Sequence, residues 1–353
     1  MSIQAYLAEA IRRKASDLHI TVNQPPILRL DGELVPLSAP DLTPADTLDM
    51  VKEVMRPDAF ADLEEKGEKD FSYSLANTGR FRVNAYRQRG SYGLAFRVVY
   101  SRIPALEELG LPPVVAELAR KRRGLILVTG PTGSGKSTTL ASMIDLINAE
   151  RRCHVLTLED PIEYLHKHNK SIVHQREVGS DTQSFANGLR SALREDPDVI
   201  LVGEMRDLET IAIAITAAET GHLVLSTLHT LGAANTIDRI IDVFPPFQQQ
   251  QIRMQLATVI EGVISQQLMA KRGEAGRVGA FEVMIATTAI RNLIREGKTY
   301  QIPTNIQTGA KFGMQTMDNA LIYLCRQGVI SRDACLTNSI DFNYVRGQLG
   351  AMA

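Results

Sequence analysis

At 353 residues the chain exceeds the size of one ordinary hydrophobic core, so two domains are expected. Its hydrophobic residues (44%) and charged residues (22%) lie close to the averages of soluble globular proteins, which excludes a disordered chain and a membrane protein. Lysine and arginine (39) nearly balance aspartate and glutamate (40), and the net charge of -1 gives no electrostatic reason to expect a nucleic-acid-binding protein.

The lack of recognisable targeting signals and the small number of cysteines predict a cytoplasmic protein. The first residues, MSIQAYLAEAIRRKASDLHI, contain acids and bases and lack the continuous apolar core of a secretory signal. No stretch approaches the roughly 20 apolar residues of a membrane-spanning helix. Cys153, Cys325 and Cys335 form no CxxC pair, so neither a zinc site nor a disulfide framework is expected. We expect membrane attachment to be supplied only by partners.

The first hundred residues are expected to form a small α+β domain, residues 1–100. Residues 3–14 read as an amphipathic helix, and residues 25–37 as a hairpin that turns at Asp31 and Gly32. Residues 80–99 read as a second antiparallel pair. In its first strand, apolar side chains (Phe81, Val83, Ala85) alternate with polar ones (Arg80, Arg82, Asn84), so one face is expected to be core and the other cationic.

A proline-containing segment, SRIPALEELGLPP at residues 101–113, predicts an interdomain connection. From residue 114 to 353, short apolar runs alternate with helical patterns, which is typical of a mainly parallel sheet covered by helices. After about Phe247 the pattern becomes mostly helical, which predicts a helical carboxyl-terminal portion packed on the second domain.

The octapeptide GPTGSGKS matches GxxxxGK[ST] at every fixed position, follows an apolar strand at residues 125–129 and opens a helix. In this context the glycines let backbone N–H groups and the helix N-terminus converge on phosphate. Lys136 adds a charge for the outer phosphates, and the Ser137 hydroxyl is a ligand for Mg²⁺. We therefore expect ATP and Mg²⁺ to bind at Gly130, Pro131, Thr132, Gly133, Ser134, Gly135, Lys136, Ser137 and Thr138.

Acidic residues follow two of the predicted strands, at the sheet edge where such folds bind ligands. Glu204 comes directly after the strand at 199–202 and suits a role as a Mg²⁺ ligand. Glu159, Asp160 and Glu163 follow the strand at 155–158. We choose Glu163 to activate water, since the turn at Pro161 would aim it into the cleft, but the residues alone do not separate it from Glu159. Glu159 and Asp160 have a second interpretation, as caps of the next segment.

His222 and His229 flank the strand in GHLVLSTLHT. Both would lie near the nucleotide edge of the sheet, where their ring N–H groups could sense the terminal phosphate. The alternative is that they are two polar residues that end a buried strand. A metal site is not expected, because no cysteine or second histidine stands at ligand spacing.

Four segments together resemble the secretion and pilus-motor ATPase superfamily: GPTGSGKSTT, TLEDPIE, LREDPDVILVGEMRDLET and TAAETGHLVLSTLHT. They look like its Walker A, Asp, Walker B and His boxes in the expected order. SDLHI, RFRVNAY, DRIIDVFP and AIRNLIRE are similar to the retraction branch, so the resemblance covers nearly the whole chain. It implies a RecA-like P-loop ATPase core with a helical carboxyl-terminal portion, preceded by a smaller α+β, PAS-like domain.

The resemblance also implies roles for residues. It makes Glu163 the catalytic glutamate, Glu204 the Walker B acid, and His222 and His229 the His-box pair. Arginines of the small domain act as fingers on ATP in the family, and the candidates are Arg80, Arg82 and Arg97. The alternative is that these arginines form a solvated strand face. AIRNLIRE is carried as a motor element, a short amphipathic helix with Ile290, Leu293 and Ile294 inward and Arg291 and Arg295 outward.

At the level of the whole protein, the resemblance implies a homo-hexameric motor that powers type IV pilus retraction, and hence twitching motility. It would act at the inner face of the cytoplasmic membrane on an inner-membrane platform protein, and only indirectly on the pilin fibre. A pilus-assembly or type II secretion ATPase is the alternative. A nucleic-acid translocase is disfavoured, because aromatic residues make up only 5% of the chain and tryptophan is absent. The acids Glu163 and Glu204 argue against a non-hydrolysing accessory subunit.

Overall fold

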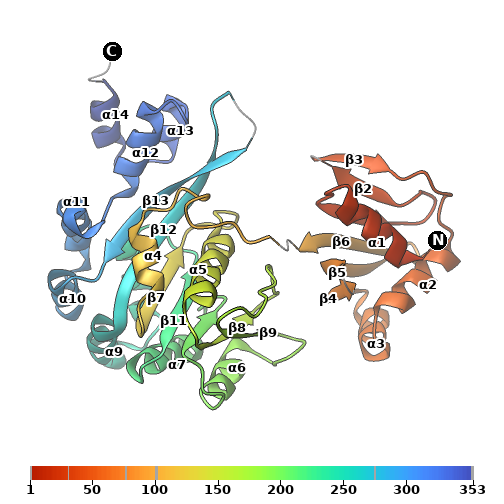
Figure 1. Cartoon of the computed structure of the whole chain (residues 1–353), viewed down its shortest axis with the longest axis horizontal. Helices are drawn as coiled ribbons and strands as arrows, with labels where there is room; N and C mark the ends of the chain where they lie inside the picture. The colour runs from red at the N-terminus through yellow and green to blue at the C-terminus, as the bar shows by residue number, and fades with distance from the viewer. Residues whose placement is uncertain (1, 31, 76–77, 100–101, 274–275, 351–353) are drawn as a thin grey trace. The chain divides into compact units, whose positions relative to one another are not determined.

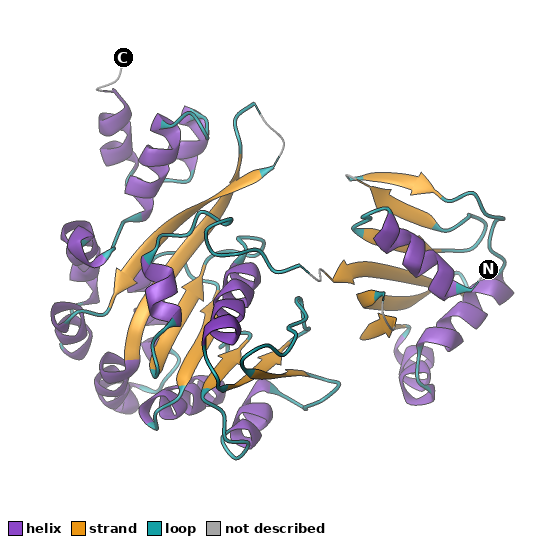
Figure 2. Cartoon of the chain, viewed as in Figure 1, coloured by secondary structure: helices purple, strands orange, loops and turns teal. Residues whose placement is uncertain are grey.

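The computed structural model describes residues 2–30, 32–75, 78–99, 102–273 and 276–350 (Figure 1). The chain separates into two compact units, the first built mainly from residues up to 102 and the second mainly from residues 103 onward. The first unit is α+β and the second is α/β, as Figure 2 shows, so the predicted fold class is confirmed.

The first unit is an antiparallel sheet with helices packed on one face. Its described strands follow the order β3-β2-β1-β6-β5-β4. The strands are β1 (Asp17–Ile20), β2 (Ile27–Leu30), β3 (Glu33–Pro36), β4 (Glu68–Leu75), β5 (Gly79–Gln88) and β6 (Ser91–Val99). The helices are α1 (Ile3–Arg12), α2 (Pro44–Val54) and α3 (Pro57–Lys66). The expected helix at 3–14 and both expected hairpins are confirmed, although Asp31 lies outside the described residues.

Alternation along β5 separates the core face of this sheet from its cationic face. Phe81, Val83 and Ala85 are fully buried in the core beneath the helices, because successive side chains of a strand point to opposite faces. Arg82 lies on the other face, where it is exposed. The predicted division into a core face and a cationic face is therefore confirmed.

The second unit is a largely parallel sheet between two layers of helices (Figures 1 and 2). Its described strands follow the order β13-β12-β7-β11-β10-β8-β9, and β13 alone among them runs antiparallel to its neighbour. The strands are β7 (Gly124–Thr129), β8 (His154–Glu159), β9 (Ile172–Glu177), β10 (Val199–Val202), β11 (Leu223–Leu228), β12 (Ile260–Ala270) and β13 (Arg277–Ile285).

Helices of this unit fall into a layer on each face and a carboxyl-terminal group. Those up to the end of the parallel strands are α4 (Val114–Ala119), α5 (Lys136–Glu150), α6 (Phe185–Ala192), α7 (Leu208–Glu219), α8 (Ala233–Asp242) and α9 (Pro246–Val259). The later ones are α10 (Thr288–Arg295), α11 (Ile302–Thr308), α12 (Met317–Arg326), α13 (Arg332–Thr337) and α14 (Phe342–Gly350), with short 3₁₀ turns at Thr299–Gln301 and Ala310–Phe312.

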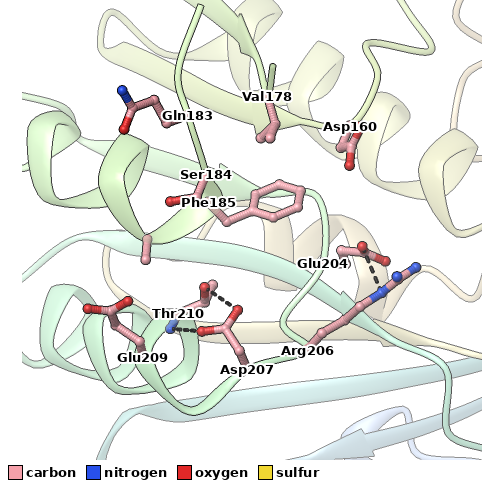
Figure 3. A pocket seen from close by; sticks show the side chains of 11 residues that line it. Asp160, Val178, Gln183, Ser184, Phe185, Glu204, Arg206, Asp207, Glu209 and Thr210 are labelled. Atoms are coloured by element: carbon pink, nitrogen blue, oxygen red, sulfur yellow. Dashed lines mark hydrogen bonds and ion pairs between the residues drawn. The ribbon is translucent and has the colours of Figure 1, made fainter. Parts of the chain in front are cut away.

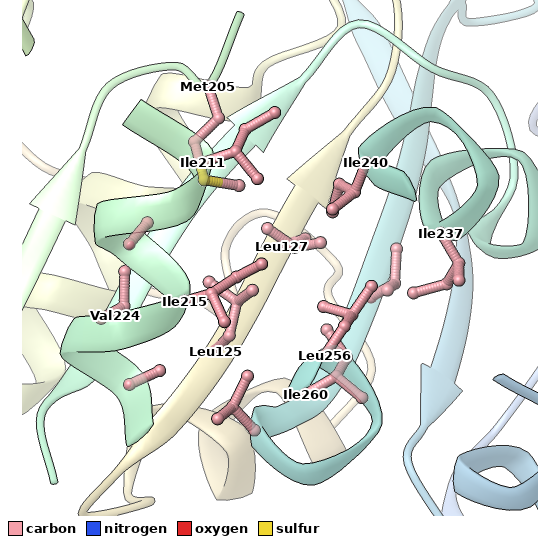
Figure 4. Close-up of a cluster of buried hydrophobic side chains, with 14 of the residues drawn as sticks. Leu125, Leu127, Met205, Ile211, Ile215, Val224, Ile237, Ile240, Leu256 and Ile260 are labelled. Atoms are coloured by element: carbon pink, nitrogen blue, oxygen red, sulfur yellow. The ribbon is translucent and has the colours of Figure 1, made fainter. Parts of the chain in front are cut away.

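Strand β7 is buried on both faces, which fixes it at the centre of the molecule's larger core. Leu125 and Leu127 pack with α7, α8 and α9, and Figure 4 shows them beside Ile215 and Leu256. The intervening Ile126 and Val128 point to the other face, against α4 and α5. A continuous apolar run buried on both faces is what a central parallel strand requires. The segment GPTGSGKS at residues 130–137, called the phosphate loop below, thus begins directly after a strand that is buried on both faces.

Two sequence-based expectations differ from the structure. Residues 260–270 and 277–285 are the antiparallel strands β12 and β13, although the pattern after Phe247 predicts mostly helix. Strand β12 is buried along nearly its whole length, so its residues show no two-residue alternation of apolar and polar types. The segment at 101–113 is largely folded onto the second unit, where Leu106 and Leu111 are buried in the core. Ser101 lies outside the described residues.

The AIRNLIRE helix, α10, is held to the core by one of its arginines. Ile290 and Ile294 are fully buried, as predicted. Arg291 does not point outward: its guanidinium donates to the carbonyls of Ala257, Thr258 and Ala286 at 2.8–3.0 Å and pairs with Glu261 at 2.8 Å. Because the last carbonyls of a helix have no partner within it, Arg291 closes the carboxyl end of α9.

Candidate nucleotide site

The predicted nucleotide residues leave neighbouring strands at one edge of the sheet. In register, Ser265 of β12 lies opposite Thr129 of β7, and Thr129 lies opposite Leu228 of β11. Likewise Ser226 of β11 lies opposite Val202 of β10, which lies opposite Leu158 of β8. At this edge lie, in spatial order, Gln266 within β12, Gly130 after β7, His229 after β11, Glu204 after β10 and Glu159 at the end of β8.

The phosphate loop has a backbone that only glycine satisfies at its start. Gly130 has φ of +140°, a region that side-chain-bearing residues rarely adopt. A Cβ at this position would lie 2.2 Å from the Gln266 carbonyl oxygen, well inside van der Waals contact. Gly133 and Gly135 also have positive φ, of +78° and +91°. The two fixed glycines of the motif, Gly130 and Gly135, are therefore backbone requirements of the loop, and Gly133 shares their positive φ.

The loop forms a cradle that fits a phosphate. The Lys136 side chain is 9% exposed, and its ammonium donates to the carbonyls of Gly130 and Pro131 at 2.9 and 3.0 Å, bending it back over the loop. Helix α5 begins at Lys136, so its free N–H groups face the loop. Among the described residues, the buried Ser134 hydroxyl has no hydrogen-bond partner. A cation, free amides and an unsatisfied hydroxyl are together the complement of a phosphate oxygen cluster.

Glu204 lies just after the carboxyl end of β10, and the side chains of an arginine and a histidine contact its carboxylate. Its carboxylate accepts from Arg206 Nε at 2.7 Å and lies 3.4 Å from His229 Nε2. The Glu204 side chain is 19% exposed, so solvent reaches it. Carboxylate and hydroxyl oxygens are the ligands that Mg²⁺ prefers, and Glu204 and Ser137 supply one of each. This donor set fits a magnesium ion carried by nucleotide.

A pocket of about 320 Å³ opens beside Glu204. Figure 3 shows Arg206 bent toward Glu204, with Asp160 and Phe185 also on the pocket wall. Its lining residues come from the ends of β8, β9 and β10 and the starts of α6 and α7, and none of them belongs to the phosphate loop. The pocket therefore extends from Glu204 toward β8 and β9, away from the loop.

The two histidines lie at opposite ends of β11. His229 follows the carboxyl end of the strand and reaches Glu204, as described above. His222 precedes the first residue of β11, and its Nδ1 lies 2.9 Å from the Ala217 carbonyl oxygen. The expectation that both lie at the nucleotide edge is therefore wrong for His222, because a strand of six residues separates it from that edge.

Glu159 and Glu163, between which the residues alone do not decide, have different surroundings in the structure. Glu159 Oε1 accepts from Thr157 Oγ1 at 2.6 Å and from Gln175 Nε2 at 3.0 Å, so that oxygen is committed to holding the sheet edge. The side chain of Glu163 is exposed. This difference favours Glu163 as the residue with a carboxylate available for chemistry.

Glu163 lies in a short segment, residues 162–166, called the Glu163 arch below. Both ends of this segment are hydrogen-bonded to side chains of β9. The Ile162 N–H donates to Glu177 Oε2 at 3.0 Å, and the His166 N–H donates to Gln175 Oε1 at 2.8 Å. The Glu177 side chain is nearly fully buried, and the Asp160–Pro161 peptide before the arch is cis. Short, doubly anchored segments place a side chain with little freedom, which is what a general base requires.

His166, which ends this arch, makes the stability of the chain depend on pH. Burial lowers its pKa from 6.5 to about 4, and among the described residues its Nδ1 has no hydrogen-bond partner. The unfolded chain therefore binds a proton that the folded chain excludes. The His166 contribution to stability is fully present above pH 6.5 and is lost as the pH falls toward 4.

We expect His166→Gln to remove this dependence. The free energy of unfolding of the wild type should fall by up to about 3 kcal/mol more than that of the variant between pH 6.5 and 4. Urea titrations at matched pH values measure the difference. Parallel pH profiles for the two proteins would contradict the assignment.

The three candidate arginines of the first unit lie on or beside the sheet face opposite its helices. Arg82 and Arg97 are cross-strand partners in β5 and β6. Arg97 is 71% exposed and pairs with Asp17 at 3.1 Å, an interaction of little energetic weight at such exposure. Arg80 is half-buried. The role of these arginines as contacts to the phosphates of ATP stays a prediction.

Sequence reasoning missed the residues that hold the site in place. Gln266 lies in a strand that the pattern did not predict, while Gln175 and Glu177 belong to an edge strand that carries no motif. Their side chains contact the phosphate loop or the Glu163 arch, yet nothing in their spacing distinguishes them from other buried polar residues. Within the described part of the chain, no helix has the length and apolar character needed to cross a membrane.

Comparison with known proteins agrees with this arrangement. Residues 1–331 match the family described as Type II/IV secretion system protein. The type IV pilus retraction ATPase PilT of Pseudomonas aeruginosa is 50% identical over 333 residues, which cover 94% of this chain and 96% of that protein. A twitching motility protein of Neisseria gonorrhoeae is 50% identical over 309 residues, covering 88% of this chain and 83% of that protein.

A solved structure gives the same result in three dimensions. The crystal structure of the pilus retraction motor PilT with bound ADP is 52% identical, covers 98% of both chains and superposes with a TM-score of 0.91. The resemblance to the retraction branch, inferred from the boxes and from AIRNLIRE, is confirmed. The chain belongs to the family of Type II/IV secretion system proteins, within which it is similar to the pilus retraction ATPases.

Proposed function

We propose that the chain is an ATP-hydrolysing motor that powers type IV pilus retraction. The observation that carries this proposal is the convergence of the phosphate loop, His229 and Glu204 at one sheet edge, in a chain that is half identical to a retraction ATPase over nearly its whole length. A protein that only binds phosphate needs no more than such a loop. A protein that hydrolyses ATP also needs carboxylates to hold Mg²⁺ and to activate water, and Glu204 and Glu163 are the candidates here.

In this mechanism the loop and its helix bind the triphosphate. The backbone amides from Gly130 to Ser137 and the Lys136 ammonium hold the phosphates, and Ser137 and Glu204 are the residues that would hold the accompanying Mg²⁺, which supplies charge neutralisation. Glu163 accepts a proton from the attacking water. His229, within reach of Glu204, links the metal ligand to the loop that follows β11.

The assembly proposed is a homo-hexamer at the inner face of the cytoplasmic membrane. Arg80, Arg82 and Arg97 are the candidates that supply positive charge to the triphosphate within this ring. Rigid-body movement during turnover would act on an inner-membrane platform protein and, through it, on the pilin fibre. Membrane association comes only through these partners, and nucleic acid has no part in the cycle.

Deleting the gene in the source organism tests the direction of the motor. We expect cells without the protein to carry excess pili that do not retract and to lose twitching motility, and Lys136→Ala supplied in trans to leave both defects uncorrected. Electron microscopy of surface pili and a surface-motility assay measure the two effects. Bald cells would instead support the alternative, a pilus-assembly or type II secretion ATPase.

A further inference from the structure

Gln266 of β12 contacts the phosphate loop at several points along its length. Its Nε2 donates to the Ser134 carbonyl at 2.7 Å, and its Oε1 accepts from Thr139 Oγ1, in the first turn of α5, at 3.0 Å. Its own carbonyl oxygen is the atom that leaves no room for a Cβ at Gly130. At Gly135 a Cβ would lie 3.2 Å from Gln266 Nε2. Gln266 therefore contacts the loop near its first residue, near Ser134 and at the start of α5.

The Gln266 carboxamide is buried and bonded through both of its polar ends. The residue is 2% exposed, so neither end exchanges its partner for water. Removing the carboxamide would leave the Ser134 carbonyl and the Thr139 hydroxyl without these bonds, on opposite sides of the turn from loop to helix. The loop would then lose the contacts that fix its curvature before nucleotide arrives.

We propose that Gln266 is a positioning residue that holds the phosphate loop in its phosphate-receiving conformation. Through Gln266, strand β12 would then influence the nucleotide affinity of the loop that joins β7 to α5. This inference rests on the assignment of the loop as the nucleotide site. Gln266 acts through the loop, whose amides and lysine contact the phosphates. Its role therefore appears in binding, equally for ground state and transition state, and not in the chemical step.

The neighbouring residue provides a matched control on the same strand. Gln267 is also nearly buried, at 9% exposure, but its side chain points to the opposite face of the sheet, where Nε2 donates to the Asn338 carbonyl at 3.4 Å. Gln267→Met removes an equivalent buried carboxamide without touching the loop. Gln266→Met and Gln267→Met therefore differ in their effect on the loop while sharing the cost of losing a buried amide.

Titration of the full-length protein with fluorescent ADP tests the proposal. We expect Gln266→Met to raise the Kd about tenfold, equivalent to about 1.4 kcal/mol, and Gln267→Met to change it less than about twofold. In steady-state assays Gln266→Met should raise KM for ATP by a similar factor and leave kcat within about twofold of the wild type. Equal Kd values for the wild type and Gln266→Met, or equal weakening by both variants, would overturn the proposal.

A double-mutant cycle isolates the hydrogen bond itself. Thr139→Val should weaken ADP binding about threefold in the wild type and have no further effect beside Gln266→Met, because the partner is already gone. Additive losses would contradict the proposed pairing. Should Gln266→Met not fold, Thr139→Val alone decides, and unchanged affinity in that variant rejects the role of Gln266.

Lys136→Ala separates this inference from the assignment on which it rests. If Lys136→Ala binds ADP as tightly as the wild type, the loop is not the nucleotide site and both proposals fail. If Lys136→Ala loses ADP while Gln266→Met retains it, only the positioning role is rejected.

Discussion

Replacing Lys136 by alanine is expected to reduce Mg²⁺-dependent ATP turnover below about 1% of the wild-type rate, through loss of nucleotide binding. The Lys136 ammonium is held over the loop by two carbonyls and is the cation positioned there for the outer phosphates. A charge-assisted contact to phosphate is roughly twice as strong as a neutral hydrogen bond, and alanine supplies no replacement. Phosphate release at an ATP concentration that saturates the wild type, together with ADP titration, measures both effects.

A lysine elsewhere in the same unit serves as the control for Lys136. Lys167 is exposed on the segment between β8 and β9, so Lys167→Ala removes the same charge from the chain without altering the loop. We expect its turnover to remain within about twofold of the wild type, as for most surface substitutions. Wild-type turnover in Lys136→Ala, or equal losses in both variants, would show that the loop does not carry the activity.

Replacing Glu163 by glutamine is expected to slow turnover by at least about 100-fold while nucleotide binding is retained. General-base catalysis contributes roughly 10²–10⁴-fold, and the amide cannot accept the proton of the attacking water. Because Glu163 is exposed and its arch is anchored through the neighbouring backbone at Ile162 and His166, the isosteric change leaves those anchors intact. Single-turnover hydrolysis and ADP titration separate the two quantities.

Glu159→Gln is the discriminating control for this prediction. Glu159 accepts hydrogen bonds from Thr157 and Gln175, so its replacement should disturb the sheet edge and lower turnover less than about tenfold. The reverse pattern, with Glu159→Gln inactive and Glu163→Gln active, would transfer the role of general base to Glu159.

The parts of the fold that could be predicted are those whose residues alternate or recur with one period. Amphipathic α1 and the β5–β6 pair each bury one face, so their apolar residues fall at fixed spacing. Strand β12 does not follow such a rule, because it is buried on both faces and carries Ser265, Gln266 and Gln267 as buried polar residues. Its partners, which make that composition acceptable, are distant in sequence and invisible to periodicity.

The candidate site likewise contains residues that the sequence predicts and residues that it does not. The phosphate loop is a local motif, and Glu204 and His229 follow buried strands whose parallel pairing brings them together, so chain order was enough to predict them. The expected position of His222 is wrong because residues that flank a strand at its two ends lie at opposite edges of the sheet. The residues that position the site, Gln266 and Glu177, act through tertiary contacts that no spacing encodes.

Phosphate release by the purified full-length protein, measured with Mg²⁺ and again with excess EDTA across a concentration series that spans oligomerisation, tests the central claim most directly. The loop, Glu204 and Glu163 together predict turnover that requires both ATP and Mg²⁺ and rises as the ring assembles. A well-folded, oligomeric protein that releases no phosphate at any concentration would contradict the assignment of this edge of the sheet as the site of ATP hydrolysis.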